Sequence, residues 1–279
     1  MPFTDPSRPS DLVMPATTQI VLIALFGLGA VATLAYVVVL STRRKDLVAV
    51  YAVGGAALAI VYEPVADMLI HCYHPERGQI PWVHTFGLHI PMFIGLGYVW
   101  YMSAGALILL CASRRGISAR QWWTGWVGFG VFAGVFEMAC VQLGHTPWIY
   151  YGPQAFQVLG IPVLTTFNYV SFDLAIGAGV CALARQLPRR LQPVIVPAVP
   201  MLMAASHVAT SLPLAIALNG TQNTTVIEAA SLLTTALSAG LSYLLSTVFR
   251  TPWPPTGRQH PGEAVPAPAP RPASYPSIS

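Results

Sequence analysis

The chain is poor in charged residues. Asp, Glu, Lys and Arg together make up 9% of its 279 residues, whereas 54% of the residues are hydrophobic. Soluble domains have a charged fraction of about 25%, so this chain lacks the polar surface of a water-soluble globule. The composition therefore predicts a polytopic membrane protein whose surroundings are a lipid bilayer.

The sequence also lacks the common motifs for disulfides, phosphates and metals. Its four cysteines form no CxxC pair, which argues against a zinc knuckle or a disulfide framework. There is no Gly-rich phosphate loop and no aspartate cluster of the DDxxD or NDxxD type, which disfavours ATP-driven chemistry and magnesium-dependent diphosphate chemistry. The histidine pairs His71/His74 and His84/His89 do not supply an iron-binding histidine box. We therefore expect neither a metal ion nor a cofactor.

Seven apolar runs have the length of membrane spans. Each contains about 20 residues or slightly more, which is enough to cross a hydrocarbon core of about 30 Å at about 1.5 Å of rise per residue. The sequence thus predicts an all-α protein with seven transmembrane helices, at residues 18–40, 47–70, 88–112, 122–143, 163–184, 194–218 and 226–249.

Basic residues predict how these helices are oriented. They are concentrated in the loops that follow the first, third and fifth spans. In the intervening loops, Arg77 is the only basic residue. By the positive-inside rule the three basic loops are cytoplasmic, so the N-terminus lies outside and the C-terminus inside. This topology accounts for the net charge of +4, and we expect no nucleic-acid partner. The residues concerned are Arg43, Arg44, Lys45, Arg114, Arg115, Arg120, Arg185, Arg189 and Arg190.

The chain divides into three parts. Residues 1–17 are an extracytoplasmic N-terminal segment without the pattern of a secretory signal, so the first span is expected to be a retained helix. Residues 18–250 form the seven-helix membrane domain. Residues 251–279 are rich in proline and are expected to be a disordered cytoplasmic tail.

Four carboxylic acids interrupt the apolar spans. An ionisable side chain within a membrane is costly unless it is paired, protonated or next to a polar cavity, so each one marks a candidate functional site. Glu63 and Asp67 lie one turn apart in the second span. Glu137 lies at a similar depth in the fourth span, and Asp173 lies near the membrane centre in the fifth.

The second span is expected to present its polar residues on one side. Glu63, Asp67 and His71 are spaced i, i+4 and i+8, which places them on one stripe of a helix, and Pro64 predicts a kink within this stripe. If helices two to five pack around a common axis, their polar groups line a cavity that opens on the outer side and has Asp173 as its floor. The alternative is that these acids only hydrogen-bond to neighbouring helices or to nearby polar side chains.

Two outer loops, at residues 71–84 and 144–156, are rich in aromatic residues, proline and glycine rather than in charge. They are expected to cover the cavity. For Trp82 and Trp148 the alternative is an aromatic belt at the membrane interface.

Acids and aromatic residues in a dry pocket suit carbocation chemistry. A carboxyl group among apolar walls is desolvated and stays protonated, which makes it a usable general acid. A proton delivered to an alkene or an epoxide generates a carbocation, which aromatic faces stabilise without adding to it as water does.

The chain resembles the integral membrane terpene cyclases of fungal meroterpenoid pathways and of bacterial indole- or diketopiperazine-terpenoid (drimentine-type) pathways. The resemblance lies in the seven-span architecture, in Tyr62-Glu63-Pro64 with Asp67, in Glu137 and in the loop Tyr150-Tyr151-Gly152-Pro153-Gln154. It implies that a protonated acid starts the cyclisation of a prenyl chain that is attached to an aromatic or peptide-derived group, without a metal. The DxDD motif of soluble protonation-type cyclases is not present.

The same loop, with Gly160-Ile161-Pro162, also looks like the carotenoid hydratases. In that family an acid likewise protonates an isoprenoid alkene and water then adds.

We expect Glu63 and Asp67 to be the acid and its partner. Glu137 and Asp173 are the next candidates, and their expected roles are the partner acid, the terminal base or groups that stabilise the cation. The residues expected to bind an isoprenoid substrate are Tyr62, His71, Trp82, Phe86, His89, Phe136, His145, Trp148, Tyr151, Asn168, Tyr169 and Phe172.

Two other classes of protein remain open. A proton-coupled transporter of a hydrophobic molecule, or a receptor, also uses membrane acids, although the sequence shows no internal repeat of the kind found in many transporters. A structural membrane subunit leaves the similar depth of Glu63, Asp67 and Glu137 unexplained.

Overall fold

The computed structural model describes residues 8–113, 115–143 and 147–252. In this part of the chain, seven helices are long and apolar enough to cross a membrane, which confirms the predicted all-α membrane fold. They are Ala16–Arg44, Val48–Ile70, Met92–Ala112, Ala119–Gln142, Thr165–Gln186, Arg189–Gly220 and Thr224–Phe249. Most of the predicted proline-rich tail, from residue 253 onward, lies outside the described residues, as do residues 1–7.

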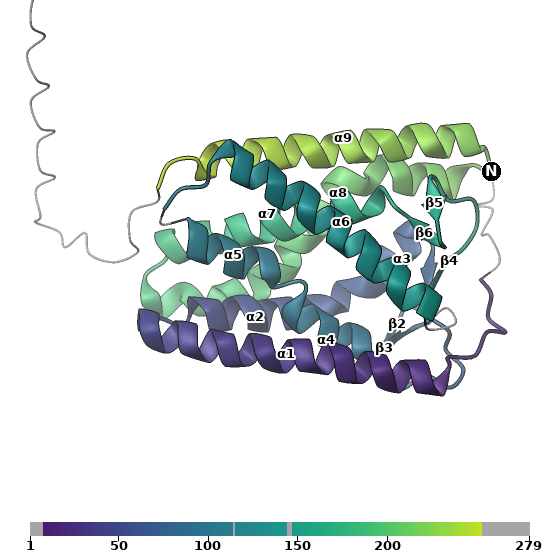
Figure 1. Ribbon diagram of the computed structural model, residues 1–279, viewed down its shortest axis with the longest axis horizontal. Coiled ribbons are helices and arrows are strands. Elements are labelled where there is room, and N and C mark those ends of the chain that lie inside the picture. Colours follow the sequence, from purple (N-terminus) through teal and green to yellow (C-terminus); the bar gives the residue numbers. More distant parts are fainter. Residues whose placement is uncertain (1–7, 114, 144–146, 253–279) are drawn as a thin grey trace, which may run out of the picture.

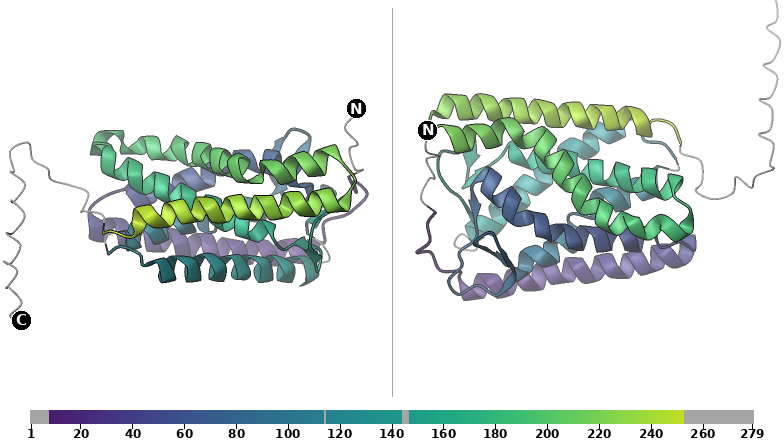
Figure 2. Two further views of the ribbon diagram at one scale, coloured as in Figure 1. Left: turned by 90° about the horizontal axis from the view of Figure 1, so that it is seen from above. Right: turned by 180° about the vertical axis from the view of Figure 1, so that it is seen from behind.

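The fifth span lies at the centre of the bundle. This helix, α7 (Thr165–Gln186), packs against α5 (Ala104–Ala112), α6 (Ala119–Leu143), α8 (Ile195–Gly220) and α9 (Thr224–Phe249). The first helix, α1 (Ala16–Arg44), packs mainly on α4 (Met92–Trp100). In Figures 1 and 2, α1 and α9 form opposite edges of the bundle.

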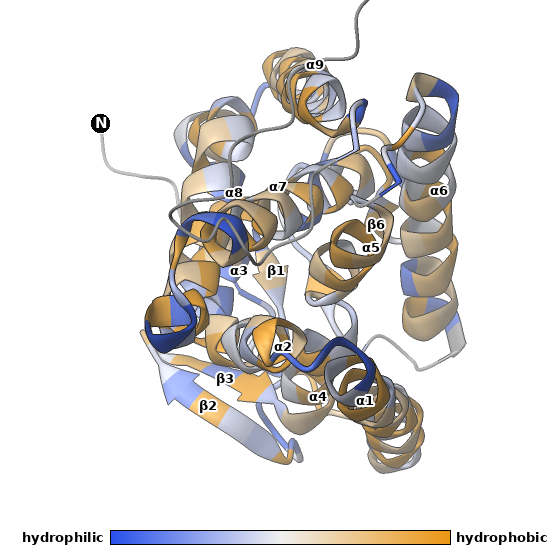
Figure 3. Ribbon diagram, turned by 90° about the vertical axis from the view of Figure 1, so that its left-hand side faces the viewer, coloured by the Kyte–Doolittle hydropathy of each residue, from blue (hydrophilic) through white to orange (hydrophobic). Residues whose placement is uncertain are grey.

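The outer faces of the helices are apolar. Leu28 of α1 is 69% exposed and Leu244 of α9 is 62% exposed. Figure 3 looks along the bundle and shows hydrophobic residues along α1 and α5, whereas hydrophilic residues gather in connecting segments. Large exposed hydrophobic side chains on long helices are typical of a surface that faces lipid.

The second and third spans are both interrupted. The second consists of α2 (Val48–Leu58), a 3₁₀ segment η1 (Ala59–Tyr62) and α3 (Glu63–Ile70). Pro64 explains this break and confirms the predicted irregularity, because its ring clashes with the carbonyl group four residues earlier and it has no N–H to donate.

The third span is broken between α4 and α5, where the sequence has no proline. There the backbone N–H of Gly105, in the first turn of α5, donates to Oδ2 of Asp173 at 2.8 Å. Gly105 also lies very close to α7, since a Cβ on Gly177 would come within 2.6 Å of the Gly105 carbonyl oxygen. The two glycines thus allow α5 and α7 to approach each other closely, as small residues do in membrane helix pairs.

A polar seam joins α9 to α7 and α8. Asn168 of α7 accepts hydrogen bonds from Thr210 (2.6 Å) and Ser238 (2.7 Å), and its amide group donates to Ser211. Side-chain hydrogen bonds between helices are one of the forces that hold membrane bundles together. The buried small polar residues of α9 recur every three or four residues, at Ser231, Thr234, Ser238, Ser242 and Ser246.

The described residues include six short strands, which lie at one end of the bundle (Figure 1). They pair as three antiparallel two-stranded sheets: β1 (Cys72–Tyr73) with β4 (Ile149–Tyr150), β2 (Pro81–Thr85) with β3 (Leu88–Pro91), and β5 (Gln157–Val158) with β6 (Ile161–Pro162). The third span therefore begins at Met92 rather than at the predicted residue 88. The β2–β3 turn is formed by Phe86 and Gly87, with φ of 52° and 70°, as a tight hairpin of two residues with positive φ requires.

Candidate functional site

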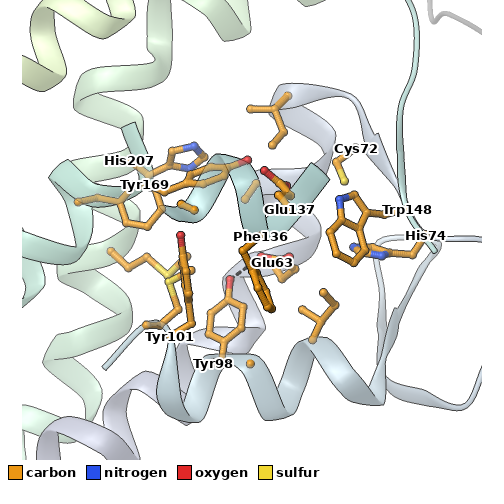
Figure 4. A pocket seen from close by; sticks show the side chains of 18 of the residues that line it. Glu63, Cys72, His74, Tyr98, Tyr101, Phe136, Glu137, Trp148, Tyr169 and His207 are labelled. Atoms are coloured by element: carbon orange, nitrogen blue, oxygen red, sulfur yellow. Dashed lines mark hydrogen bonds between the residues drawn. The ribbon is translucent and has the colours of Figure 1, made fainter. Parts of the chain in front are cut away.

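A cavity lies inside the strand-bearing end of the bundle (Figure 4). It contains about 890 Å³ of space not occupied by protein atoms, open solvent included. Its wall is mostly apolar and comes from α1, α3, α4, α6, α7 and α8, together with the segments around β1 and β4. The described residues of the wall are Phe26, Glu63, Ala66, Ile70, Cys72, His74, Ile94, Gly97, Tyr98, Tyr101, Met102, Ala133, Phe136, Glu137, Trp148, Tyr150, Tyr169, Phe172, Met203 and His207.

Glu63 reaches the cavity from the first turn of α3. The hydroxyl group of Tyr98, on α4, donates a hydrogen bond to its Oε2 atom at 2.5 Å. The contact joins the second and third spans across the cavity and fixes one oxygen of the carboxyl group.

Glu137 reaches the cavity from α6 and is held in the same manner. The hydroxyl group of Tyr150, on β4, donates to its Oε1 atom at 2.5 Å, and the hydroxyl groups of Tyr150 and Tyr169 are 3.0 Å apart. The other oxygen, Oε2, is buried and accepts no hydrogen bond of normal geometry within the described residues, and the Trp148 side chain lies beside the carboxyl group and interacts with it. A buried polar atom without a partner is rare in folded proteins and marks a candidate site.

Aromatic rings surround the two carboxyl groups. Phe136 packs against both Phe26 and Trp100, at ring-centroid distances of 5.6 and 5.9 Å. Tyr169 lies 5.7 Å from Phe172. Figure 4 shows Phe136, Tyr98 and Tyr101 projecting into the same space as Glu63 and Glu137.

His207 brings α8 into the site. Its Nδ1 atom is 3.1 Å from the hydroxyl group of Tyr62, and its ring packs edge-on against Phe172 at 5.4 Å. The contact with Tyr62 is a hydrogen bond between the second span and α8. His207 also lines the cavity, a role that its sequence position did not predict, while Tyr62 lies behind it, outside the described wall.

The cavity brings together six of the residues that the sequence singles out. Helices two to five all contribute, as expected, and α1 and α8 contribute as well. The six residues are Glu63, Glu137, Phe136, Trp148, Tyr169 and Phe172.

Asp67 and Asp173 are not part of the described cavity wall. Asp67 is 4% exposed and lies against His74, with 3.6 Å between Oδ2 and Nε2. Asp173 lines a separate cavity next to α5 and α6 and binds the backbone of Gly105. The expectation that Asp173 forms the floor of the cavity beside Glu63 is thus wrong, because the break in the third span uses this carboxyl group as a hydrogen-bond acceptor.

The predicted stripe along the second span ends early. His71 adopts a left-handed backbone conformation, with φ of 55°, which terminates α3. Its ring stacks on the Tyr151 ring, with 5.0 Å between the ring centroids. Its Nε2 atom forms a hydrogen bond with Oδ1 of Asn219, at 3.1 Å. Neither His71 nor Tyr151 belongs to the described wall of the cavity.

The remaining predicted binding residues lie elsewhere. Asn168 belongs to the polar seam, Trp82 and Phe86 are 51% and 65% exposed on the β2–β3 hairpin, and the His89 ring is 4.1 Å from that of His84. His145 is outside the described residues.

Several residues of the wall were not predicted as binding residues, chiefly Cys72, His74, Tyr101 and Tyr150. Cys72 and Tyr150 face each other in the β1–β4 pair, and two-residue strands leave no periodic signal in a sequence. Burial raises the pKa of the Cys72 thiol and of the Tyr150 hydroxyl group well above their usual values. Burial lowers the pKa of His74 to about 4, so its ring is neutral at pH 7.

No protein-family model matches the chain, and neither curated proteins nor solved structures include a significant match to it.

Proposed function

We propose that the protein is a membrane-bound terpene cyclase that protonates a prenyl chain on a prenylated substrate and directs its cyclisation. The single observation that carries this proposal is the cavity itself. Glu63 and Glu137 enter one apolar, aromatic-lined space, and a tyrosine hydroxyl group holds each of them.

Glu63 and Glu137 are the proposed acid and base. One carboxyl group gives its proton to an alkene carbon, and the alkene electron pair forms the new C–H bond and leaves a cation on the neighbouring carbon. A second alkene of the same chain attacks this cation and closes a ring. The other carboxyl group, as carboxylate, then removes a proton, and the electrons of that C–H bond form the final alkene, so that substrate and product have the same mass.

The aromatic wall suits the cation that this mechanism needs. A cation over the face of an aromatic ring is stabilised by about 0.5–2 kcal/mol, and Tyr101, Phe136, Trp148 and Tyr169 offer several such faces. The apolar remainder of the wall limits the access of water, which would otherwise trap the cation.

Hydration is the second reaction that the same acid can start. Tyr150 opens the loop that looks like that of the carotenoid hydratases, and it contacts Glu137 directly. In that reaction water adds to the cation instead of an alkene, so the product is heavier by one water.

Membranes that contain the protein provide the test. They are incubated with prenylated indoles and prenylated diketopiperazines, and the products are followed by mass spectrometry. A new compound of unchanged mass supports cyclisation, a gain of one water supports hydration, and uptake of unchanged compound supports a transporter.

Glu63→Gln and Glu137→Gln are the decisive variants, because an amide keeps the shape of the carboxyl group but cannot deliver the proton. We expect each to reduce product formation at least about 100-fold, the usual contribution of general acid–base catalysis. Glu228→Gln, a matched change on α9 outside the described cavity wall, should retain activity. Full activity of both cavity variants would refute the proposal.

A further inference from the structure

Three potential metal ligands meet at the edge of the cavity. Ligand atoms of Asp67, Cys72 and His74 all lie within 4.8 Å of one another. Cys72 and His74 also line the cavity, whereas Asp67 lies behind them. We refer to these three residues as the Asp67–Cys72–His74 cluster.

Local structure explains why they meet. Asp67 is in the last turn of α3, and the chain reverses at His71 to enter β1. In extended chain, residues two apart point to the same side, so Cys72 and His74 both face back toward Asp67. The pairing of β1 with β4 holds this segment in place.

The cluster is buried, and the protein itself leaves the ring of His74 without a hydrogen bond of normal geometry within the described residues, whereas Asp67 and Cys72 interact with each other. The exposed fractions of Asp67, Cys72 and His74 are 4%, 6% and 4%. The Pro147 backbone lies beside His74, but neither ring nitrogen of His74 makes a hydrogen bond of normal geometry within the described residues. Phe93 and Trp148 pack around this ring, at centroid distances of 6.4 and 6.2 Å. Polar groups in apolar surroundings are costly without a partner.

The ligand set fits zinc. Thiolate, imidazole and carboxylate are the three protein ligand types of Zn²⁺, and with metal–ligand bonds of about 2.0–2.3 Å the ligand atoms of a tetrahedral site are about 3.3–3.8 Å apart. The Nε2 atom of His74 and the Oδ2 atom of Asp67 are 3.6 Å apart. The ligand atoms lie within 4.8 Å of one another, so the widest separation in the cluster needs to close by at most about 1–1.5 Å for the same geometry.

We propose that the Asp67–Cys72–His74 cluster binds a zinc ion at the wall of the cavity. Binding displaces the thiol proton of Cys72 to solvent and forms a sulfur–zinc bond. Three protein ligands leave the fourth tetrahedral position open, as in catalytic rather than structural zinc sites. Because Cys72 and His74 line the cavity, an oxygen or nitrogen atom of a molecule bound there can occupy that position. This role differs from the one that the sequence indicates for Asp67.

The test measures metal content of the full chain in detergent, without any isoprenoid compound, so its outcome is independent of the proposed cyclase activity. After incubation with zinc and removal of the excess, we expect about one ion per chain. Cobalt in place of zinc should give a thiolate-to-cobalt charge-transfer band. Cys72→Ser should abolish this band, and Cys72→Ser and His74→Gln should each weaken zinc binding more than about tenfold, because they remove direct ligands.

Two control variants separate this cluster from other metal-binding groups. Cys181→Ser changes another buried cysteine, and the double change His84→Gln with His89→Gln removes the histidine pair of the β2–β3 hairpin. Both should keep the zinc. Wild-type protein that binds no zinc, or zinc that persists in both Cys72→Ser and His74→Gln, would overturn the proposal, as would zinc that is lost only with the hairpin histidines. Size-exclusion profiles identify variants that fail to fold, and His74→Gln still provides the test if Cys72→Ser is one of them.

Discussion

A tyrosine hydroxyl group donates to each of the two cavity carboxyl groups, and the two donors come from different kinds of element. Tyr98 lies on a helix and Tyr150 on a short strand. A hydrogen bond of this kind fixes where one carboxyl oxygen points, and therefore where the other oxygen can meet a bound molecule. The orientation of Glu63 and Glu137 thus depends on side chains from other elements, 35 and 13 residues away along the chain.

We predict that Tyr98→Phe lowers the rate of product formation about 10-fold to 100-fold, because a hydrogen bond to an ionisable group contributes about 1.5–3 kcal/mol. Tyr101→Phe is the matched control on the same wall, since Tyr101 makes no hydrogen bond to Glu63 or Glu137 in the described structure. Turnover of both variants on one prenylated substrate is compared. Equal losses in the two variants would contradict a positioning role for Tyr98.

At this scale the sequence predicted correctly that Glu63 and Glu137 line one cavity, because acids at similar depth in two spans can meet in the space between the helices. The sequence did not indicate that Asp67 and Asp173, unlike Glu63 and Glu137, lie outside the described cavity wall. Depth can be counted along a sequence, but the direction in which a side chain points depends on the helix breaks. The 3₁₀ segment before Glu63 and the turn before Gly105 change those directions.

At the contact of α5 with α7, the two backbones lie so close that there is no space for an added side chain. Gly177→Ala would place a methyl group against the backbone of Gly105, which cannot move without displacing α5. We expect a loss of about 1–3 kcal/mol in the free energy of unfolding, the usual cost of overpacking. Thermal unfolding in detergent measures this as a lower melting temperature.

Gly240→Ala on α9 is the matched control, because nothing lies within 4 Å of the added methyl group. It should leave the melting temperature unchanged or raise it slightly, since alanine favours a helix over glycine by about 1 kcal/mol. A Gly177→Ala protein as stable as the Gly240→Ala protein would show that α5 and α7 do not pack as closely as described.

The helices themselves were largely predictable, because a span of about 20 apolar residues has few alternatives. Pro64 also predicted the break in the second span. The break in the third span had no comparable signal, since it depends on Asp173, which lies far along the chain. The short strands were not predicted either. For that reason the positions of Cys72, His74 and Tyr150, which lie in or next to these strands, were not predicted.

For the whole molecule, the basic loops make a prediction about orientation. The ends of the helices that carry Arg43, Arg115 and Arg185 should face the cytoplasm, and the end with the strands and the cavity should face outside. A fluorescent protein that folds only in the cytoplasm should therefore fluoresce when it is fused to the C-terminus, and it should be dark when fused after residue 222, between α8 and α9. The reverse pattern would contradict this topology.

The cavity wall consists of segments that are synthesised at different times, because they are far apart in the sequence. Phe26 enters with the first span, and His207 enters only with the sixth. Before the later spans have inserted, Glu63 and Glu137 have no complete pocket around them. Their carboxyl groups must then be solvated by lipid headgroups, by water or by the insertion machinery. Slow insertion of α8 should therefore expose these acids to membrane quality control, and the yield of the protein in cells should be sensitive to the later spans even when the earlier ones are correct.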